Sequence, residues 1–473
     1  MTGSLPTMRL VHLDLKGAAP RVSYLEQVFP FLSQLGANGI LIEYEDMFPF
    51  KGELEVLRSP YAYSEEDIER IQQLAEQHKL EVVPLVQTFG HVEFILKHEK
   101  YQHLREVERF PNSFNPHVPN TLALLRSILA QVIEKHRRST WIHIGADEVF
   151  HLGEGMDSKN WMSRNKGDVG TMFLKHIKEV LGFLSAQYWG LRVLMWDDML
   201  RKISCPRLAL PAESGIAKHV SPVVWFYAPD FEAEQIGKPF LTKYAESGFE
   251  AVWFASAFKG TTGPAQTWTP LSYHLKNHLS WLKVMQALPR LAPLRFQGIV
   301  LTGWQRYDHY SVLCELLPVG IPSLAICLQT LVNGEPAALP AQPGSPPPPT
   351  ACQSLACREG DGGRWECHQG LVQPLPSEAP LWEPPQHGEL RQQGAHRREL
   401  DPSGEGLLPR HGGGVDGGER QPLPGPAAGP GAGLPGHHPP QRPAQGHVGA
   451  AAPQLSLPPW LVFGGQHRVS VCW

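Results

Sequence analysis

The sequence predicts an α/β fold, a (β/α)8 TIM barrel, from three observations. Eight short runs rich in β-branched and aromatic residues recur within the first 332 residues. Longer segments between them show the 3.6-residue periodicity of amphipathic helices. No glycine-rich nucleotide-binding loop follows the first run, which argues against the alternative of a doubly wound sheet. Strands and helices that alternate eight times match the count of a closed barrel.

The expected strands are short and mostly apolar, as parallel strands buried on both faces are. In chain order they are Arg9–Leu13, Gly39–Glu43, Glu81–Val86, Trp141–Ile144, Arg192–Trp196, Pro222–Phe226, Ala251–Phe254 and Gly298–Leu301. Ser64 and Asp67 have the spacing of a capping box, which predicts the start of a helix. Periodicity predicts further helices at Leu122–Lys135, Met172–Gln187, Ser272–Met285 and Tyr310–Leu331.

A change of composition near Asn333 divides the chain into two regions. Residues 334–473 hold 25 of the 45 prolines and contain no Lys, Ile, Asn, Met or Tyr. Such a segment buries too little apolar surface to offset the entropy lost on ordering. We therefore expect a catalytic barrel domain over residues 1–332 and a low-complexity, Pro/Gly-rich, disordered tail over residues 333–473.

The overall composition is that of a globular protein with no electrostatic footprint for nucleic acid or anionic membranes. The 473 residues are 42% hydrophobic and carry a formal net charge of −4. No apolar run approaches the roughly 18 residues of a membrane span. The chain has no N-x-S/T sequence, and its seven scattered cysteines form no disulfide framework. We expect a cytoplasmic or nuclear protein without a cofactor, and the oligomeric state stays open.

The expected carboxyl ends of the strands are rich in carboxylates and tryptophans. In a barrel the chemistry gathers at this end, so these residues are the candidate site. Flat indoles suit the apolar faces of a sugar ring, and carboxylates suit its hydroxyls, although any single tryptophan also fits simple core packing. The candidates are Asp14, Lys16, His91, Asp147, Glu148, Trp196, Trp225, Tyr227, Trp253 and Trp304.

Two adjacent carboxylates stand out in the run HIGADEV, residues 143–149. Ordinary retaining glycosidases hold two carboxyl groups about 5–5.5 Å apart on opposite sides of the bond. Neighbours such as Asp147 and Glu148 fit that arrangement poorly and better suit a substrate that carries its own nucleophile. A 2-acetamido group can attack the anomeric carbon while one carboxylate orients it and the other protonates the leaving oxygen. The alternative is that the two carboxylates belong to a solvent-exposed acidic turn without a catalytic role.

These motifs resemble glycoside hydrolase family 20, the β-N-acetylhexosaminidases. HIGADEV is similar to the family's H-x-G-x-D-E signature, and PLVQTFGH at residues 84–91 resembles its strand-three segment ending in Gly-His. RLVHLDLKG near the start resembles its first strand, and the tryptophan of strand eight fits as well. The resemblance covers about residues 8–332.

The resemblance implies retaining, substrate-assisted hydrolysis of terminal N-acetylhexosamine residues on a glycan or glycoconjugate. Glu148 would be the general acid/base, and Asp147 would hold and polarise the acetamido group. His91 would belong to a hydrogen-bonded network behind Glu148. Trp196, Trp225, Trp253 and Trp304 would wall the sugar subsite.

The sequence departs from the family pattern at positions that bind sugar hydroxyls. Lys16 stands where the family has an arginine, and Arg306 where it has a carboxylate. Many relatives have a tyrosine after strand seven, and no residue here matches it. Tyr227, after strand six, is the candidate for its role. The preference for gluco or galacto substrates therefore stays open. A metal-dependent barrel hydrolase using His12 and Asp14, and a catalytically impaired isoform that only binds sugar, are the alternatives, although histidines in ligand spacing are not found at later strand ends.

Overall fold

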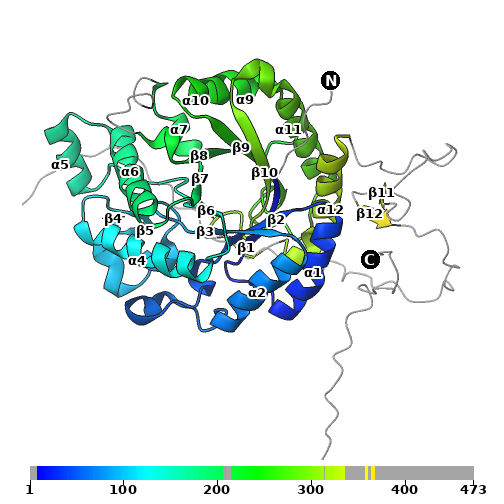
Figure 1. Ribbon diagram of the computed structural model, residues 1–473, viewed down its shortest axis with the longest axis horizontal. Helices are drawn as coiled ribbons and strands as arrows, with labels where there is room; N and C mark the ends of the chain where they lie inside the picture. The colour runs from blue at the N-terminus through cyan, green and yellow to red at the C-terminus, as the bar shows by residue number, and fades with distance from the viewer. Residues whose placement is uncertain are drawn as a thin grey trace, which may run out of the picture. The chain divides into compact units, whose positions relative to one another are not determined.

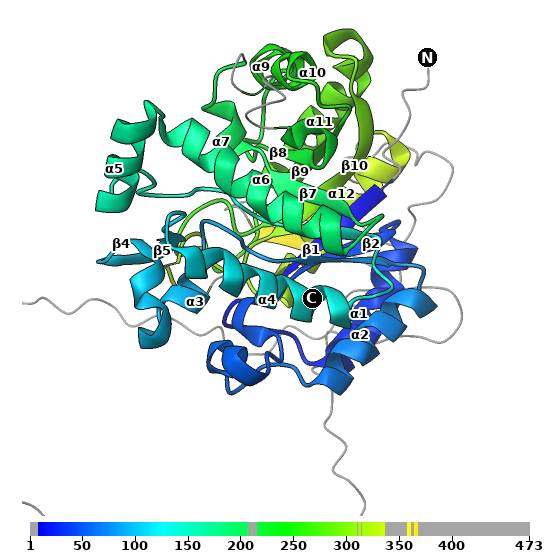
Figure 2. The same cartoon turned by 60° about the vertical axis from the view of Figure 1, so that its left-hand side comes forward.

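Eight parallel strands close into a barrel in the order β1-β10-β9-β8-β7-β6-β3-β2 (Figure 1). The computed structural model describes residues 8–205, 208, 215–309, 311–313 and 315–335, and the backbone of residues 357–360 and 364–367. Helices surround the strands on the outside (Figure 2). The predicted (β/α)8 barrel is confirmed.

The barrel strands begin close to where the sequence predicts them, but two of them are longer. Their bounds are β1 Met8–Asp14, β2 Gly39–Glu43, β3 Glu81–Leu85, β6 Trp141–His143, β7 Arg192–Trp196, β8 Ser221–Trp225, β9 Ala251–Lys259 and β10 Arg295–Gly303. The two long strands β9 and β10 pair with each other along most of their length. Strand β9 therefore continues well beyond Phe254, where the sequence pattern predicts its end.

The helices that follow the strands supply the outer layer. Their bounds are α1 Val22–Gln34, α2 Glu65–Gln77, α3 Glu93–Leu96, α4 Pro119–Lys135, α5 Met156–Asn165, α6 Val169–Gln187, α7 Asp198–Arg201, α9 Ala233–Ile236, α10 Lys243–Glu246, α11 Leu271–Leu291 and α12 Leu317–Asn333. The Ser64 hydroxyl accepts a hydrogen bond from Asp67 N, and the Asp67 carboxylate accepts one from Ser64 N, so the predicted capping box is confirmed. A short hairpin of β4 Arg105–Val107 and β5 Phe110–Phe114 follows β3 and was not predicted.

The last helix begins later than the sequence predicts. Periodicity places its start at Tyr310, which lies outside the described residues, but α12 begins at Leu317. Glu315 just before it has a φ of +45° and accepts a hydrogen bond from Gly260 N, so the chain there is held in a loop. Pro318 then occupies the first turn of the helix. A proline is tolerated there because backbone N–H groups in the first turn have no partner within the helix.

Two layers of apolar side chains fill the protein. Inside the barrel, side chains from the strands stack on one another, as the interior of such a barrel requires. This inner cluster consists of Leu10, Leu41, Val83, Leu85, Trp141, Leu194, Trp196, Val223, Trp253, Ala255 and Val300. A larger cluster lies between the outer faces of the strands and the helices.

The predicted boundary between two regions falls at the end of α12, at Asn333. The expectation of a disordered tail over residues 333–473 lies outside the described residues, apart from residues 333–335 and the backbone of two short paired strands. These strands are β11 Cys357–Gly360 and β12 Arg364–Cys367. Within the described part of the chain, none of the helices is both long and apolar enough to cross a membrane.

Candidate active site

The adjacent carboxylates Asp147 and Glu148 lie on a backbone held in an unusual conformation. Strand β6 ends at His143, and Gly145, Ala146 and Glu148 then have φ values of +62°, +67° and +40°. Left-handed backbone costs free energy for residues other than glycine and often accompanies function. It gives the two side chains different surroundings, because that of Asp147 is 11% exposed and that of Glu148 is 41% exposed.

A glycine allows the neighbouring loop to approach this backbone. A Cβ atom on Gly90 would lie 2.3 Å from the carbonyl oxygen of Asp147, which no side chain tolerates. The next residue, His91, has a φ of +53°. The Gly-His pair after β3 therefore brings the imidazole of His91 against the carboxylates after β6.

His91 contacts both carboxylates through one ring nitrogen. Its Nε2 lies 3.3 Å from Asp147 Oδ2 and 3.2 Å from Glu148 Oε2. Burial disfavours the charged ring, but the charges and hydrogen bonds of Asp147 and Glu148 outweigh burial and raise the pKa of His91 well above its usual value. Burial also works against ionised Asp147, and the imidazolium outweighs it, so the pKa of Asp147 is lowered. Asp147 is therefore held as a carboxylate.

Several buried polar atoms around the pair have no hydrogen-bond partner among the described residues. They are Asp147 Oδ1, Trp196 Nε1 and His143 Nε2. Buried polar groups are nearly always hydrogen-bonded, and exceptions mark places where a ligand or water completes the set. Asp147 thus has one oxygen committed to His91 and a second oxygen free to accept a hydrogen bond.

Asp198 supports Glu148 from the next strand end. Its Oδ2 accepts a hydrogen bond from Glu148 N at 2.9 Å, and its Oδ1 accepts one from Trp225 Nε1 at 3.4 Å. Burial, and then the nearby charge of Asp147, raise the pKa of Asp198 to about 7. The sequence places Asp198 at a strand end but gives no sign of this supporting contact.

The other side of His91 meets two residues that extend the network. His91 Nδ1 lies 2.9 Å from His309 Nε2, which is in turn 3.3 Å from Glu93 Oε2. Burial, followed by the charge of Lys16, lowers the pKa of His309 to about 3. The prediction that no histidine in ligand spacing comes from later strand ends is therefore wrong. His309 was missed because it follows β10 in a loop without regular periodicity.

Lys16 and Asp14 form an ionic cluster on a different wall. Lys16 Nζ lies 3.0 Å from Asp14 Oδ1, 3.1 Å from Glu43 Oε1 and 3.2 Å from Glu45 Oε1. Glu43 Oε2 is also 3.1 Å from His12 Nε2. Burial raises the pKa of Glu45 to about 8, because Lys16 compensates it only in part and Glu43 and Asp14 repel it. Glu43 and Glu45 were not predicted as site residues.

Three of the four predicted tryptophans lie near these groups. The rings of Trp196 and Trp304 are 6.0 Å apart, and Lys16 Nζ is 5.7 Å from the ring centre of Trp304. Trp225 stacks on Tyr227 at 5.2 Å. Burial raises the pKa of Tyr227, and the charges of Asp147 and Glu148 add to the effect, so Tyr227 lies near the pair.

The fourth tryptophan, Trp253, is not at the end of its strand, and the prediction that it walls this subsite is wrong. It is the third residue of β9, which runs on to Lys259. Its side chain is fully buried inside the barrel, packs edge-on against Trp141 at 5.2 Å and donates a hydrogen bond from Nε1 to Gln297 Oε1. Trp253 is a core residue of the amino-terminal half of the barrel.

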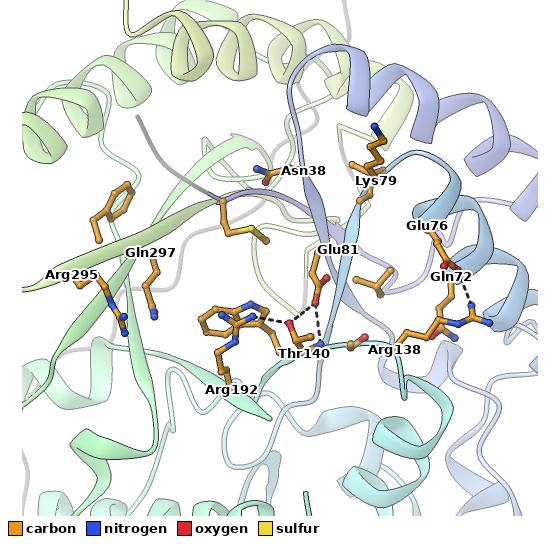
Figure 3. Close-up of a pocket in the computed structure, with 16 residues that line it drawn as sticks. Asn38, Gln72, Glu76, Lys79, Glu81, Arg138, Thr140, Arg192, Arg295 and Gln297 are labelled. Atoms are coloured by element: carbon orange, nitrogen blue, oxygen red, sulfur yellow. Dashed lines mark hydrogen bonds and ion pairs between the residues drawn. The ribbon is translucent and has the colours of Figure 1, made fainter. Parts of the chain in front are cut away.

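A hollow of about 940 Å³ opens at the amino-terminal end of the barrel (Figure 3). Trp141 lines it, and the guanidinium of Arg192 lies 3.8 Å above the Trp141 ring. Glu81 Oε1 accepts hydrogen bonds from both the N–H and the hydroxyl of Thr140. The carboxylate pair does not line this hollow, so the candidate chemistry lies at the other end.

Two groups of side chains at the carboxyl end have atoms close enough to share a cation. They are His91 with Glu93 and His309, and His91 with Asp147 and Glu148, each with ligand atoms within 4.8 Å of one another. The expected metal ligand His12 belongs to neither group, because its two nitrogens face Glu43 Oε2 and Gly303 N.

Similarity to known proteins agrees with this geometry. Residues 27–225 match the model of the glycosyl hydrolase family 20 catalytic domain. Hexosaminidase D of Bos taurus is 53% identical over 329 residues, which are 69% of this chain and 93% of that protein. The chain belongs to glycoside hydrolase family 20. As a family 20 member it is a glycosidase of the β-N-acetylhexosaminidase type that acts on a glycan substrate, and the predicted resemblance is confirmed.

A second relative supports the family 20 assignment, and a solved structure shows a similar fold. Hexosaminidase D of Homo sapiens is 52% identical over 336 residues, which are 71% of this chain and 68% of that protein. The crystal structure of a β-N-acetylhexosaminidase from Bacteroides fragilis superimposes with a TM-score of 0.51 at 19% identity. The superposition covers 68% of this chain and 66% of that one. That structure supports the family 20 barrel fold.

Proposed function

We propose that this chain is an exo-acting β-N-acetylhexosaminidase. It removes terminal non-reducing N-acetylgalactosamine or N-acetylglucosamine residues with retention of configuration, through an oxazolinium intermediate. The observation that carries the proposal is the pair itself: Asp147 has a buried, unpartnered Oδ1, and the more exposed Glu148 is joined to it through His91. The hexosaminidase names of the relatives support the same activity.

The first step uses the substrate's own amide as the nucleophile. The acetamido N–H donates a hydrogen bond to Asp147 Oδ1, and the acetamido oxygen attacks the anomeric carbon. The bond to the leaving oxygen breaks as Glu148 gives that oxygen its proton. Ionised Asp147, which is buried, stabilises the positive charge that develops on the oxazolinium ring.

The second step returns the enzyme to its starting state. Water attacks the anomeric carbon, Glu148 takes the water proton, and the ring opens to restore the acetamide. His91 supports both steps, since its positive charge keeps Asp147 ionised and its Nε2 positions Glu148. Two displacements at one carbon give net retention, the outcome of the substrate-assisted exception to the two-carboxylate scheme.

The aromatic and ionic walls are proposed to bind the sugar at the cleaved end. Trp225, Trp304 and Tyr227 offer faces for the pyranose ring, whereas the buried Trp196 packs against Trp304 and offers its Nε1. Asp14 and Lys16 offer polar groups to its hydroxyls. A lysine lacks the planar fork of an arginine, and Lys16 is already shared among three carboxylates, so we expect modest discrimination between gluco and galacto substrates.

Paired aryl glycosides of N-acetylglucosamine and N-acetylgalactosamine test the proposal. We expect that the β-anomers are hydrolysed and that the sugar first released has the β-configuration. We also expect strong inhibition by a thiazoline that mimics the oxazolinium ion. Activity in excess chelator separates this mechanism from a metal-dependent hydrolase. Hydrolysis that stops with chelator, or a first product of inverted configuration, would contradict it.

Two further expectations stay proposals beside the activity. Residues 1–332 form the catalytic domain, and limited proteolysis that leaves a stable fragment ending near Asn333 would support this boundary. A cytoplasmic or nuclear location is tested by microscopy of the tagged full chain, and a signal confined to secretory compartments would refute it.

A further inference from the structure

We propose that His91, Glu93 and His309 form a binding site for a divalent cation of the zinc class, and that its occupation inhibits the enzyme. Binding itself stands on the geometry of these three side chains. The inhibition rests on the proposed roles of His91 and Glu148, which need no metal. The site is thus a control point beside the catalytic pair and not part of the hydrolytic steps.

The three ligand atoms already lie at nearly the spacing a cation requires. His91 Nδ1 and His309 Nε2 are 2.9 Å apart, and His309 Nε2 is 3.3 Å from Glu93 Oε2. Two ligands of a tetrahedral zinc ion, each about 2.0–2.2 Å from it, lie roughly 3.3 Å from each other. A small opening of the histidine pair therefore creates a two-histidine, one-carboxylate set with room for a fourth ligand.

Glu93 Oε2 is the least satisfied atom of the set. It is buried and makes no hydrogen bond among the described residues, although it faces the ring nitrogen of His309. His309 Nε2 and Glu93 Oε2 form an ion pair only if His309 is protonated, and the same two atoms can both bind a cation. A bound cation would satisfy Glu93 Oε2 and both ring nitrogens together.

Different elements hold the ligands, so the site depends on the closed barrel. His91 lies on the strained turn after β3, and Glu93 opens α3 two residues later. His309 comes from the loop after β10, and its ring stacks on that of His91 with centroids 5.1 Å apart. The turn and the short helix fix two ligands, and the His309 loop supplies the third.

Charges of both signs lie around the site, since Lys16 as well as carboxylates acts on His309. The charges of Asp147 and Lys16 both act on the pKa of Glu93, Asp147 raising it and Lys16 lowering it. The charge of Glu43 in turn acts to raise the pKa of Asp147. Carboxylates at this end outnumber Lys16 and Arg201, the basic side chains paired with them.

Occupation of the site would act on the catalytic pair through His91. The cation replaces the proton shared by His91 Nδ1 and His309 Nε2, while His91 Nε2 faces Asp147 and Glu148. To admit the cation the two rings must separate, and the ring of His91 is then fixed by the cation and no longer by the carboxylates. The contacts from His91 Nε2 to Asp147 and Glu148 are disturbed, so turnover falls when the cation binds.

Zinc titration of the full chain against a chromophoric zinc chelator tests the binding. The tail contains further histidines and cysteines, so the decisive quantity is the difference between variants. We expect His309→Ala to remove one zinc equivalent, and Glu93→Gln to weaken that site by at least about tenfold. His151→Ala, which alters an exposed His–Glu pair, is the matched control and should bind as the unaltered chain does. Thermal melting of each variant verifies folding.

Turnover measured in parallel separates this inference from the proposed function. In chelator the unaltered chain should hydrolyse its substrate, and added zinc should inhibit it reversibly. Each variant is compared with its own metal-free rate, and His309→Ala should lose most of the zinc inhibition. Equal zinc binding by folded His309→Ala and the unaltered chain would overturn the cation site, whatever the activity. A chain that is inactive in chelator but still binds this zinc equivalent would refute the proposed hydrolase activity and leave the cation site standing.

Discussion

The two ends of the barrel are built from the same strands but differ in how their polar groups are satisfied. At the amino-terminal end, Glu81 accepts two hydrogen bonds from Thr140, and Arg192 stacks on Trp141 (Figure 3). At the carboxyl end, Asp147 Oδ1 and Trp196 Nε1 are buried without partners. The amino-terminal end also has such an atom, the hydroxyl Ser139 Oγ beside the hollow, but it is uncharged, whereas at the carboxyl end a carboxylate oxygen is left for a ligand to complete.

Backbone conformation differs in the same direction. At the carboxyl end His91, Ala146 and Glu148 have positive φ values, which cost free energy that packing elsewhere must offset. At the amino-terminal end Lys79 also has a positive φ, of +56°, but it lies in the turn between α2 and β3, while Trp253 packs in the core. A parallel barrel can thus keep stabilising contacts at one end and strained, reactive groups at the other.

The largest expected effect is that of Glu148→Gln. The amide cannot give a proton to the leaving oxygen, so turnover of aryl N-acetylhexosaminides should fall by about 10²–10⁴-fold. The loss should shrink for leaving groups that need no proton. Glu81→Gln at the other end is the control, and steady-state kinetics should show little change in kcat. Equal losses in the two variants would remove the distinction between the ends.

Asp147→Asn should have the next largest effect. The amide cannot stabilise the positive oxazolinium, and kcat on substrates with an acetamide should fall by about 10²–10³-fold. Analogues without the acetamide are turned over slowly, and that rate should change little in the variant. The measurement is kcat of both enzymes on both types of substrate. An equal loss on both types would contradict participation by the substrate.

Trp253→Leu should affect stability and not substrate binding. The smaller side chain leaves a cavity beside Trp141 and removes one hydrogen bond to Gln297, so the free energy of unfolding should fall by about 2–4 kcal/mol. Urea denaturation measures this loss, and KM should stay unchanged. Trp304→Leu is the matched variant at the carboxyl end, where KM should rise. A raised KM in Trp253→Leu would show that Trp253 contacts the sugar after all.

Glu45→Gln should produce the smallest effect, seen in the pH dependence of stability. Glu45 in the folded chain has a pKa of about 8 against a usual value of 4.5, so the folded state holds a proton that the unfolded state has lost. This contribution to the free energy of unfolding falls as pH rises from 4.5 to about 8.

The variant lacks this proton, so its stability relative to the unaltered chain should increase by about 1–2 kcal/mol between pH 5 and pH 8. Urea denaturation at the two pH values measures the difference. Exposed Glu55→Gln is the control and should show no such change. A constant difference across the window would contradict the raised pKa.

The sequence by itself determined the barrel and the adjacent carboxylates. Alternation of apolar strands with amphipathic helices is a local property, so strand β7 at Arg192–Trp196 and the capping box at Ser64 could be read directly. The run HIGADEV and the Gly-His pair after β3 are local as well, because the backbone that presents Asp147 and Glu148 needs small residues at fixed positions.

Only the tertiary structure decided which distant side chains meet. His91 and His309 are 218 positions apart, and nothing near His309 in the chain signals their contact. The length of β9 depends on pairing with β10, so the sequence pattern ended the strand too early and assigned Trp253 to the wrong level of the barrel. Periodicity reports which face of an element is buried, whereas partners and depth follow from how the elements pack together.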